Sequence, residues 1–307
     1  MRSNTEIDKY IAQTDIGNKL DFKKYIPISD LDQKWGFVIN DLGRTEIAEN
    51  SNYPTKGHPG THMFSWESGR ILNGYHFILI TKGEGVFESK SAGKRTIKAG
   101  DGFMLFPGDW HRYRPLKESG WTENWIGFSG HIAESIMQDF FFSKKQAVVQ
   151  NCANMLVLNL LKSLFQLLAE EPFGYQRTAS GVCIQLMAEV CNIQKAAETP
   201  RLSSSLISKA KYLMNKKIDE NIDFHLFCKN NRISYSKFRA DFKYQTGFPP
   251  LQYFLQLKIE KAKDLLLNSE LKAKEIAFKL GFQSENYFGR IFKLKTGFTP
   301  QQFRKSS

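Results

Sequence analysis

Several polar side chains near the C-terminus have the types and the spacing that suit contact with DNA bases. Phe288 and Phe292 fall on one face of a predicted helix, and Asn286, Arg290 and Lys293 fall on the other. Arginine pairs with guanine through two hydrogen bonds, and asparagine pairs with adenine in the same way. A lysine at the end of such a helix suits a phosphate better. These residues therefore indicate recognition of a duplex.

The segment that carries these residues occurs twice. The string Phe-Lys-x-x-Thr-Gly-Phe-x-Pro runs over residues 242–250 and again over 292–300. A repeat at this distance marks a duplicated structural unit. Residues 203–307 hold 20 Lys and Arg against 9 Asp and Glu, so this third carries nearly all of the net charge of +12. A helical spacer would explain the repeat alone, whereas a nucleic-acid-binding unit explains the repeat and the charge.

Each copy is predicted to be a pair of helices joined by a turn. In the second copy, Ile276, Ala277 and Leu280 share one helical face. Gly281 supplies a residue that tolerates a positive φ at the turn. Ser284 is a good N-cap for the helix that follows. The outward face of that helix is the part of a helix-turn-helix unit that enters the major groove.

The first copy has equivalent signals. Asp223 and Ser234 are predicted N-caps, and Phe238 and Phe242 form a buried stripe. Between the copies, residues 251–267 have the apolar spacing of one amphipathic helix. A rigid helix there could hold the two recognition helices about one turn of DNA apart, roughly 34 Å.

Residues 204–305 resemble the AraC/XylS family of bacterial transcription regulators, which has a tandem helix-turn-helix domain. The matching motifs are Ile276-Ala277-x-x-x-Gly281-Phe282, Tyr287-Phe288-x-Arg290-x-Phe292-Lys293 and Gly297-x-x-Pro300. The first copy departs from the family at Phe227-Cys228, where small residues are usual. Lys258 stands where the linking helix commonly has arginine.

Carried over by position, the resemblance implies a set of residues that contact bases. They are Ser236, Lys237, Arg239, Glu285, Asn286, Tyr287 and Arg290. Lys243 and Lys293 close the two helices, where contact with phosphate is expected. Glu285 could accept a hydrogen bond from cytosine, although phosphate would repel it.

Residues 35–130 have the alternating pattern of short strands separated by turns. A strand is predicted over 75–81, a tight turn at Gly83-Glu84-Gly85 and a return strand over 86–88. Further strands are predicted over 96–98, 103–106 and 121–128. Strands of this length and spacing favour an antiparallel barrel or jelly roll.

Gly100-Asp101 through Pro107-Gly108-x-x-His111 resembles the second motif of cupins, a family that includes metal enzymes. Such a metal site needs a His-x-His pair with a downstream carboxylate. The sequence has no such pair, because His76 stands alone and His58 and His62 fall in a loop. We therefore expect no metal and no other cofactor, and we expect His111 to be a hydrogen-bonded structural residue.

A barrel of this size can enclose one small ligand. The run 75–128 is similar to the arabinose-binding sensor domain of the AraC/XylS family. By position, this resemblance implies that Arg70 binds sugar hydroxyls, Tyr113 pairs with a hydroxyl and Trp125 stacks on the ring. Glu123 stands where that sensor has a histidine, which leaves the particular sugar open. Simple burial in the core is the alternative for Tyr113 and Trp125.

Two helices are predicted between the barrel and the repeat, over 153–170 and 176–197. The second has a heptad-like apolar seam at Ala179, Cys183, Leu186, Val190 and Ile193. The seam could pack on the barrel or join two chains. The family resemblance favours the second possibility, a homodimer.

The expected fold is α+β with two domains: a cupin-like antiparallel barrel followed by two helices, then an all-α tandem helix-turn-helix domain. The boundaries are an N-terminal arm over 1–34, the barrel over 35–150, a helical dimerisation segment over 151–197, a linker over 198–205 and the DNA-binding domain over 206–305. With 307 residues, two domains are the ordinary expectation.

Composition narrows the class of protein. The four cysteines show no CxxC pairing, no apolar run is long enough to cross a bilayer, and the first residues do not resemble a signal peptide. These features favour a cytoplasmic protein with reduced cysteines and no membrane partner.

Together these observations predict a DNA-binding transcription regulator, an activator that responds to a small sugar, with an arabinose-like pentose favoured. Its expected partners are operator DNA, the sugar, a second copy of the chain and RNA polymerase. Two alternatives stay open: a metal-dependent cupin enzyme fused to a DNA-binding module, and a regulator without a small ligand.

Overall fold

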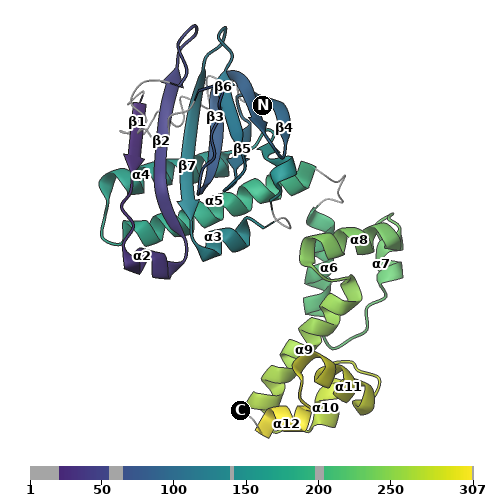
Figure 1. The fold of residues 1–307 in the computed structure, drawn as a ribbon. Helices are drawn as coiled ribbons and strands as arrows, with labels where there is room; N and C mark the ends of the chain where they lie inside the picture. The colour runs from purple at the N-terminus through teal and green to yellow at the C-terminus, as the bar shows by residue number, and fades with distance from the viewer. Residues whose placement is uncertain (1–20, 55–64, 139–141, 198–203, 306–307) are drawn as a thin grey trace. The chain divides into compact units, whose positions relative to one another are not determined.

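The computed structural model describes residues 21–54, 65–138, 142–197 and 204–305, and the chain divides into two compact units, Met1–Thr199 and Pro200–Ser307 (Figure 1). The first unit holds a sheet with covering helices, and the second is helical. The predicted two-domain α+β layout is confirmed. The division falls within the predicted linker 198–205, most of which lies outside the described residues.

The first unit contains an antiparallel sheet. Its strands are β1 Asp21–Tyr25, β2 Val38–Ile47, β3 Tyr75–Ser89, β4 Gly93–Lys98, β5 Gly102–Leu105, β6 His111–Pro115, β7 Trp121–Ser129 and β8 Val148–Val149. The strand order is β1-β2-β7-β3-β5-β8, and β4 and β6 both pair with the second half of β3. Among the described strands the pairing does not close into a ring, so the expectation of a closed barrel is wrong. The short β8 and the edge strand β1 end the sheet instead.

Strand β3 also corrects the predicted hairpin. Residues 75–89 form one continuous strand, with a register shift between Ile80 and Lys82 against β7, instead of reversing at Gly83. Gly83 has a φ of +80°, and a Cβ there would lie 2.1 Å from the carbonyl oxygen of Gly120. The glycine thus permits a bend and a close approach between strands, a use that the sequence alone does not distinguish from a turn.

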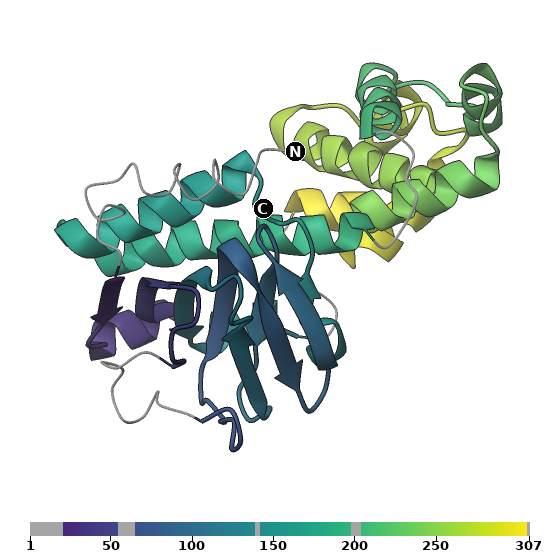
Figure 2. The ribbon, with the colours of Figure 1, turned by 90° about the horizontal axis from the view of Figure 1, so that it is seen from above.

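Helices α4 Met155–Glu170 and α5 Tyr175–Ala197 run side by side against the sheet (Figure 2). Gln176 fixes α5 to β2, because its side chain accepts from the amide of Ile39 (3.3 Å) and donates to the carbonyl of the same residue (3.1 Å). The short helices α2 Asp30–Trp35 and α3 His131–Ile136 lie at the ends of strands.

The heptad-like seam of α5 is buried inside this unit. Ala179, Cys183, Leu186 and Val190 are fully buried in the same core as the sheet, and Ile193 packs against it. Of the two possibilities, packing against the sheet domain is therefore the one observed, and the seam is not available to join two chains.

Part of the predicted N-terminal arm belongs to the sheet domain. Residues 21–25 form strand β1, which pairs with β2, and residues 30–35 form α2. Residues 1–20 lie outside the described part of the chain.

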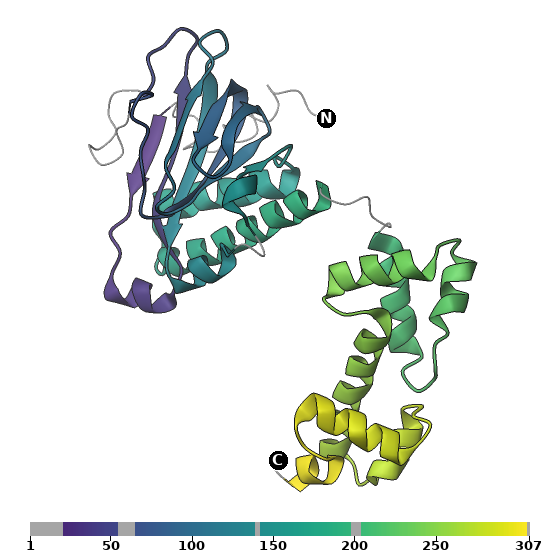
Figure 3. The same ribbon diagram turned by 45° about the vertical axis from the view of Figure 1, so that its right-hand side comes forward.

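The second unit consists of seven helices in the described residues. They are α6 Ser204–Lys216, α7 Phe224–Asn230, α8 Tyr235–Thr246, α9 Pro250–Asn268, α10 Ala273–Lys279, α11 Glu285–Thr296 and α12 Pro300–Lys305. Helix α9 runs between a first group, α6 to α8, and a second group, α10 to α12 (Figure 3). Each group has its own apolar cluster, and α9 contributes side chains to both.

The predicted caps and turn of the repeat are confirmed. Asp223, Ser234 and Ser284 are N-caps whose side chains accept hydrogen bonds from backbone amides one turn on. Gly281 has a φ of +68°. Phe238, Phe242, Phe288 and Phe292 are fully buried. None of the described helices is long and apolar enough to span a bilayer.

Candidate ligand pocket and DNA-binding surface

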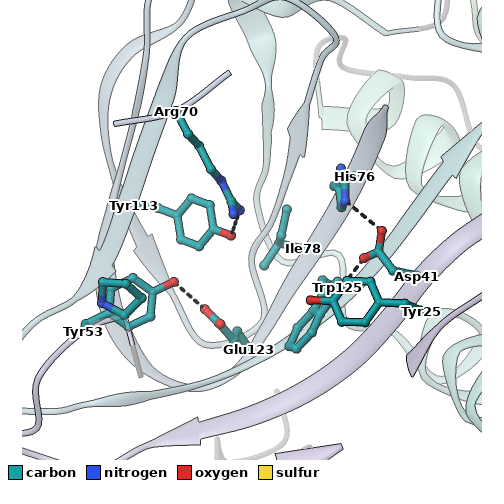
Figure 4. Close-up of a pocket in the computed structure, with 10 residues that line it drawn as sticks. Tyr25, Asp41, Tyr53, Arg70, His76, Ile78, Tyr113, Glu123 and Trp125 are labelled. Atoms are coloured by element: carbon teal, nitrogen blue, oxygen red, sulfur yellow. Dashed lines mark hydrogen bonds and ion pairs between the residues drawn. The ribbon is translucent and has the colours of Figure 1, made fainter. Parts of the chain in front are cut away.

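A pocket lies on the face of the sheet opposite α4 and α5, and all four predicted ligand-binding residues line it (Figure 4). Its lining is Tyr25, Asp41, Tyr53, Pro54, Arg70, His76, Ile78, Tyr113, Glu123 and Trp125. Strand β7 supplies Glu123 and Trp125, two residues apart and hence on one face. Tyr113 comes from β6, and Arg70 comes from the segment that precedes β3.

Backbone pairing places the Arg70 guanidinium in the pocket. Arg70 and His111 form an isolated antiparallel bridge, with N–H to O distances of 2.9 and 3.0 Å. The guanidinium donates to the Tyr113 hydroxyl at 2.6 Å and to His111 Nε2 at 3.3 Å. Since His111 Nε2 accepts, its Nδ1 carries the proton and donates to the carbonyl of Asp109 (3.0 Å).

His111 is therefore a structural support for Arg70. Burial lowers the pKa of His111 to about 4, so the ring is neutral near pH 7. Burial also raises the pKa of Tyr113 to about 12, and the neighbouring Arg70 charge opposes that rise. The expected hydrogen-bonded role of His111 agrees with these contacts.

A second polar group surrounds Trp125. Its indole N–H donates to Asp41 Oδ1 at 3.0 Å, and His76 Nε2 lies 3.2 Å from Asp41 Oδ2. The indole lies over Gly43, where a Cβ would come within 2.2 Å of the ring. Asp41 thus fixes the plane of the indole while leaving one ring face toward the pocket.

The third polar group joins Glu123 to Tyr53. The Tyr53 hydroxyl donates to Glu123 Oε2 at 3.1 Å, from a segment outside the sheet. Burial raises the pKa of Glu123 to about 7, against the hydrogen bond from Tyr53 and the charge of Arg70, which both favour the carboxylate. Burial likewise raises the pKa of Tyr53 well above its ordinary value.

The space within this lining is small. It amounts to about 440 Å³ including the solvent at its mouth, but the centre of a water molecule can reach only about 20 Å³ of it. That is roughly enough for one water. A larger ligand requires a lining side chain to move.

Four polar or aromatic residues of the lining are not among those predicted from the sequence to bind the ligand: Tyr25, Asp41, Tyr53 and His76. Asp41 and Tyr25 lie on strands that no local pattern had identified. A useful signal was present in β2, where Asp41 and Gly43 alternate toward one face.

No group of three or more His, Cys, Asp or Glu residues is arranged to hold a metal in the part of the chain that the structure describes. His58 and His62, the other histidines considered, lie outside it. The four cysteines all lie in the described residues and form no disulfide, and three of them are buried.

The nine predicted DNA-binding residues are all exposed on the second unit. Ser236, Lys237, Arg239 and Lys243 lie on α8, and Glu285, Asn286, Tyr287, Arg290 and Lys293 lie on α11. The phenylalanines of each helix face the core, so the polar residues have a free outer face. The Arg290 guanidinium lies 5.5 Å from the centroid of the Tyr287 ring, which restrains it before any contact with DNA. Lys237 Nζ lies 3.7 Å from Asp241 Oδ2, an acidic group that α11 does not have at the matching position.

Comparisons with known proteins agree with both units. Residues 58–187 match the AraC-like ligand binding domain, and residues 227–306 match a helix-turn-helix domain. The HTH-type transcriptional activator RhaR of Enterobacter sp. (strain 638) is 30% identical over 125 residues, which are 40% of this chain and 44% of that protein. The chain thus spans less than half the length of this relative.

The Msm operon regulatory protein of Streptococcus mutans is 24% identical over 249 residues, 75% of this chain and 83% of that protein. A solved structure, the C-terminal domain of the response regulator yesN from Fusobacterium nucleatum, is 32% identical, with 33% of this chain and 99% of that chain covered and a TM-score of 0.32. The proteins named as activators or operon regulators support a regulator over an enzyme. With an AraC-like ligand binding domain followed by a helix-turn-helix domain, the chain belongs to the AraC/XylS family of transcription regulators.

Proposed function

We propose that this protein is a transcription activator that binds operator DNA through α8 and α11 and an uncharged monosaccharide in the sheet domain. The observation that carries the ligand proposal is the pocket itself. An indole plane, a guanidinium, two carboxyls and three phenols surround one small space. Aromatic planes stack on the apolar face of a sugar, and the polar groups match hydroxyls, which both donate and accept.

The charges of the pocket favour an uncharged sugar over a sugar acid or a sugar phosphate. Arg70 already donates to Tyr113 and His111, whereas Asp41 and Glu123 place two carboxyls on the lining. An anionic group would lie close to both carboxyls, and Arg70 is the one arginine or lysine among the described residues that line the pocket. The space as it stands holds about one water, so any sugar must displace part of the lining, and a compact pentose such as arabinose requires less displacement than a larger sugar does.

Binding of a sugar is proposed to displace Tyr53. The Tyr53 hydroxyl occupies the position beside Glu123 that a sugar hydroxyl would take. A ligand changes DNA binding only if it prefers one arrangement of the protein over another. In the closed arrangement the Tyr53 phenol bonds to Glu123, and in the occupied arrangement a sugar hydroxyl takes its place. The sugar therefore binds only the second arrangement, which gives it the required preference.

A homodimer in the cytoplasm that contacts RNA polymerase is part of the proposal, and the family resemblance supports it. Since the apolar seam of α5 is buried, the dimer must use another surface. Sedimentation of the purified protein measures the oligomeric state, and a monomer at all concentrations would remove the dimer from the proposal.

Calorimetry with pentoses, hexoses and a uronic acid tests the ligand. We expect heat of binding with at least one neutral sugar, none with the uronic acid, and loss of binding in Trp125→Ala. Trp35→Ala is the matched control, since Trp35 is exposed on α2 away from the pocket lining. Absence of binding with every sugar would favour a regulator without a small ligand, and stoichiometric iron, nickel or manganese in the purified protein would favour the cupin enzyme.

A further inference from the structure

Lys258 is a buried charge at the junction of the two helix-turn-helix halves. It lies on α9 and is only 3% exposed. Its ammonium donates to the carbonyl of Glu220, in the loop between α6 and α7, at 2.8 Å. The ammonium also lies 4.7 Å from the ring centroid of Phe254 and 5.5 Å from that of Phe282. One side chain therefore touches the first half, the linking helix and the second half.

Ring contacts continue from there to both recognition helices. On one side, Phe254 contacts Phe224 at 6.3 Å, and Phe224 contacts Phe238 of α8 at 6.4 Å. On the other side, Phe282 contacts Phe288 of α11 at 5.1 Å. The two recognition helices are thus joined by a continuous path of packed side chains with the ammonium at its centre.

The backbone of the two halves also meets beside this ammonium. A Cβ on Gly281, in the turn before α11, would lie 2.3 Å from the carbonyl oxygen of Asp219 and 3.2 Å from Lys258 Nζ. Burial lowers the pKa of Lys258, and the nearby Asp219 charge opposes that fall. An apolar residue could fill the same volume, but it could not donate to a carbonyl. A buried charge with a directed hydrogen bond fixes one orientation where apolar packing tolerates several.

We propose that Lys258 is a positioning residue that fixes the orientation of α8 relative to α11 and thereby sets the spacing of DNA half-sites that the domain accepts. This inference rests on the proposed DNA-binding function. One base pair inserted between half-sites rotates the second by roughly 34° and shifts it by about 3.4 Å, because a turn of B-DNA holds 10–10.5 base pairs. A rigid pair of helices tolerates such a change poorly, whereas a loosely joined pair tolerates it well.

The test uses the full-length protein and a duplex selected from random sequence by the wild type. Versions of that duplex with one base pair added or removed between the half-sites are bound in parallel. We expect the wild type to lose at least about tenfold in affinity on the altered spacings. Lys258→Met should bind the selected duplex about tenfold more weakly and discriminate between spacings by less than about threefold.

Two control variants distinguish an effect on the orientation of α8 relative to α11 from a general loss of stability. Lys258→Arg keeps a buried donor and should restore the discrimination of the wild type. Lys261→Met removes the same charge from an exposed position of α9 and should leave the discrimination unchanged. Undiminished discrimination in a folded Lys258→Met protein would overturn the inference.

If Lys258→Met does not fold, the exposed loop is changed instead. Asp219→Gly combined with Glu220→Gly loosens the segment that supplies the carbonyl without touching the core. The loop variant should also discriminate less between spacings, and full discrimination would again overturn the inference. Failure of the wild type to bind any duplex would instead refute the proposed function.

Discussion

Replacement of Glu123 by glutamine should stabilise the sheet domain in alkaline solution and leave it unchanged in acid. Glu123 is buried, and its carboxyl has a pKa of about 7 in the folded protein against an ordinary value of 4.5. Glutamine has nearly the same shape and keeps a carbonyl that can accept from Tyr53. The substitution thus removes the ionisation and little else.

The size of the effect follows from the pKa difference. Below pH 4.5 the carboxyl is mostly protonated in both the folded and the unfolded state, so its ionisation does not change the free energy of unfolding. Between pH 4.5 and about 7 the unfolded chain releases the proton while the folded protein keeps it, so the free energy of unfolding falls with pH. A difference of about 2.5 pKa units corresponds to a loss of roughly 3 kcal/mol above pH 7. The Gln variant avoids this loss.

Tryptophan fluorescence during urea unfolding measures the difference, because all five tryptophans lie in the first unit. We expect Glu123→Gln to exceed the wild type by 1 to roughly 3 kcal/mol at pH 8 and to equal it near pH 4.5. Glu118→Gln, at an exposed position, is the matched control and should change neither value. A Gln variant less stable than the wild type at pH 8 would refute the assignment of Glu123 as a carboxyl whose ionisation is opposed by burial.

Further predictions concern the helical domain and the pocket. Arg290→Ala should weaken binding to a selected operator by roughly 1–3 kcal/mol and relax the sequence preference of the protein. Lys293→Ala should weaken binding to every duplex alike and reduce the slope of log affinity against log salt concentration by about 1. Equal losses of Arg290→Ala on selected and random DNA would show that Arg290 does not contact bases. Trp125→Ala should abolish the response of a reporter gene to the sugar and leave the affinity for DNA unchanged. An unchanged response would show that Trp125 is a core residue that does not bind the ligand. Ser284→Ala should destabilise the helical domain by about 1 kcal/mol through loss of the N-cap, as measured by circular dichroism during urea unfolding. Gly281→Ala should cost more than that, since it meets a positive φ and the Asp219 carbonyl together; a stability equal to that of the wild type would contradict the close contact.

The helical domain could be predicted closely because its signals are local. N-caps such as Ser284, the glycine at 281 and phenylalanines four residues apart each specify structure within one or two turns of helix. The fifty-residue repeat then supplied a second, independent copy of the same signals. Nothing local indicated that Lys258 is buried, since its environment comes from a loop 38 residues earlier and a ring 24 residues later.

The sheet domain was harder to predict from the sequence because its arrangement depends on pairing between strands that are far apart in the chain. Gly83 and Gly85 have the composition of a turn, yet they lie within a continuous strand whose bend depends on contact with Gly120 and Trp121. Asp41 reaches Trp125 only because β2 pairs with β7, 84 residues away. For the same reason the seam of α5 could be predicted as a buried stripe, while the surface that buries it could not.

The proposed function requires the two matched helices of the basic domain, α8 and α11, to bind successive grooves of a duplex. A hydroxyl-radical footprint of the full-length protein on a selected operator tests it most directly. We expect two protected regions on one face of the DNA, about 10–10.5 base pairs apart, and we expect the protection of both to weaken together as the salt concentration is raised. A single protected groove, or no salt-sensitive protection at all, would contradict it.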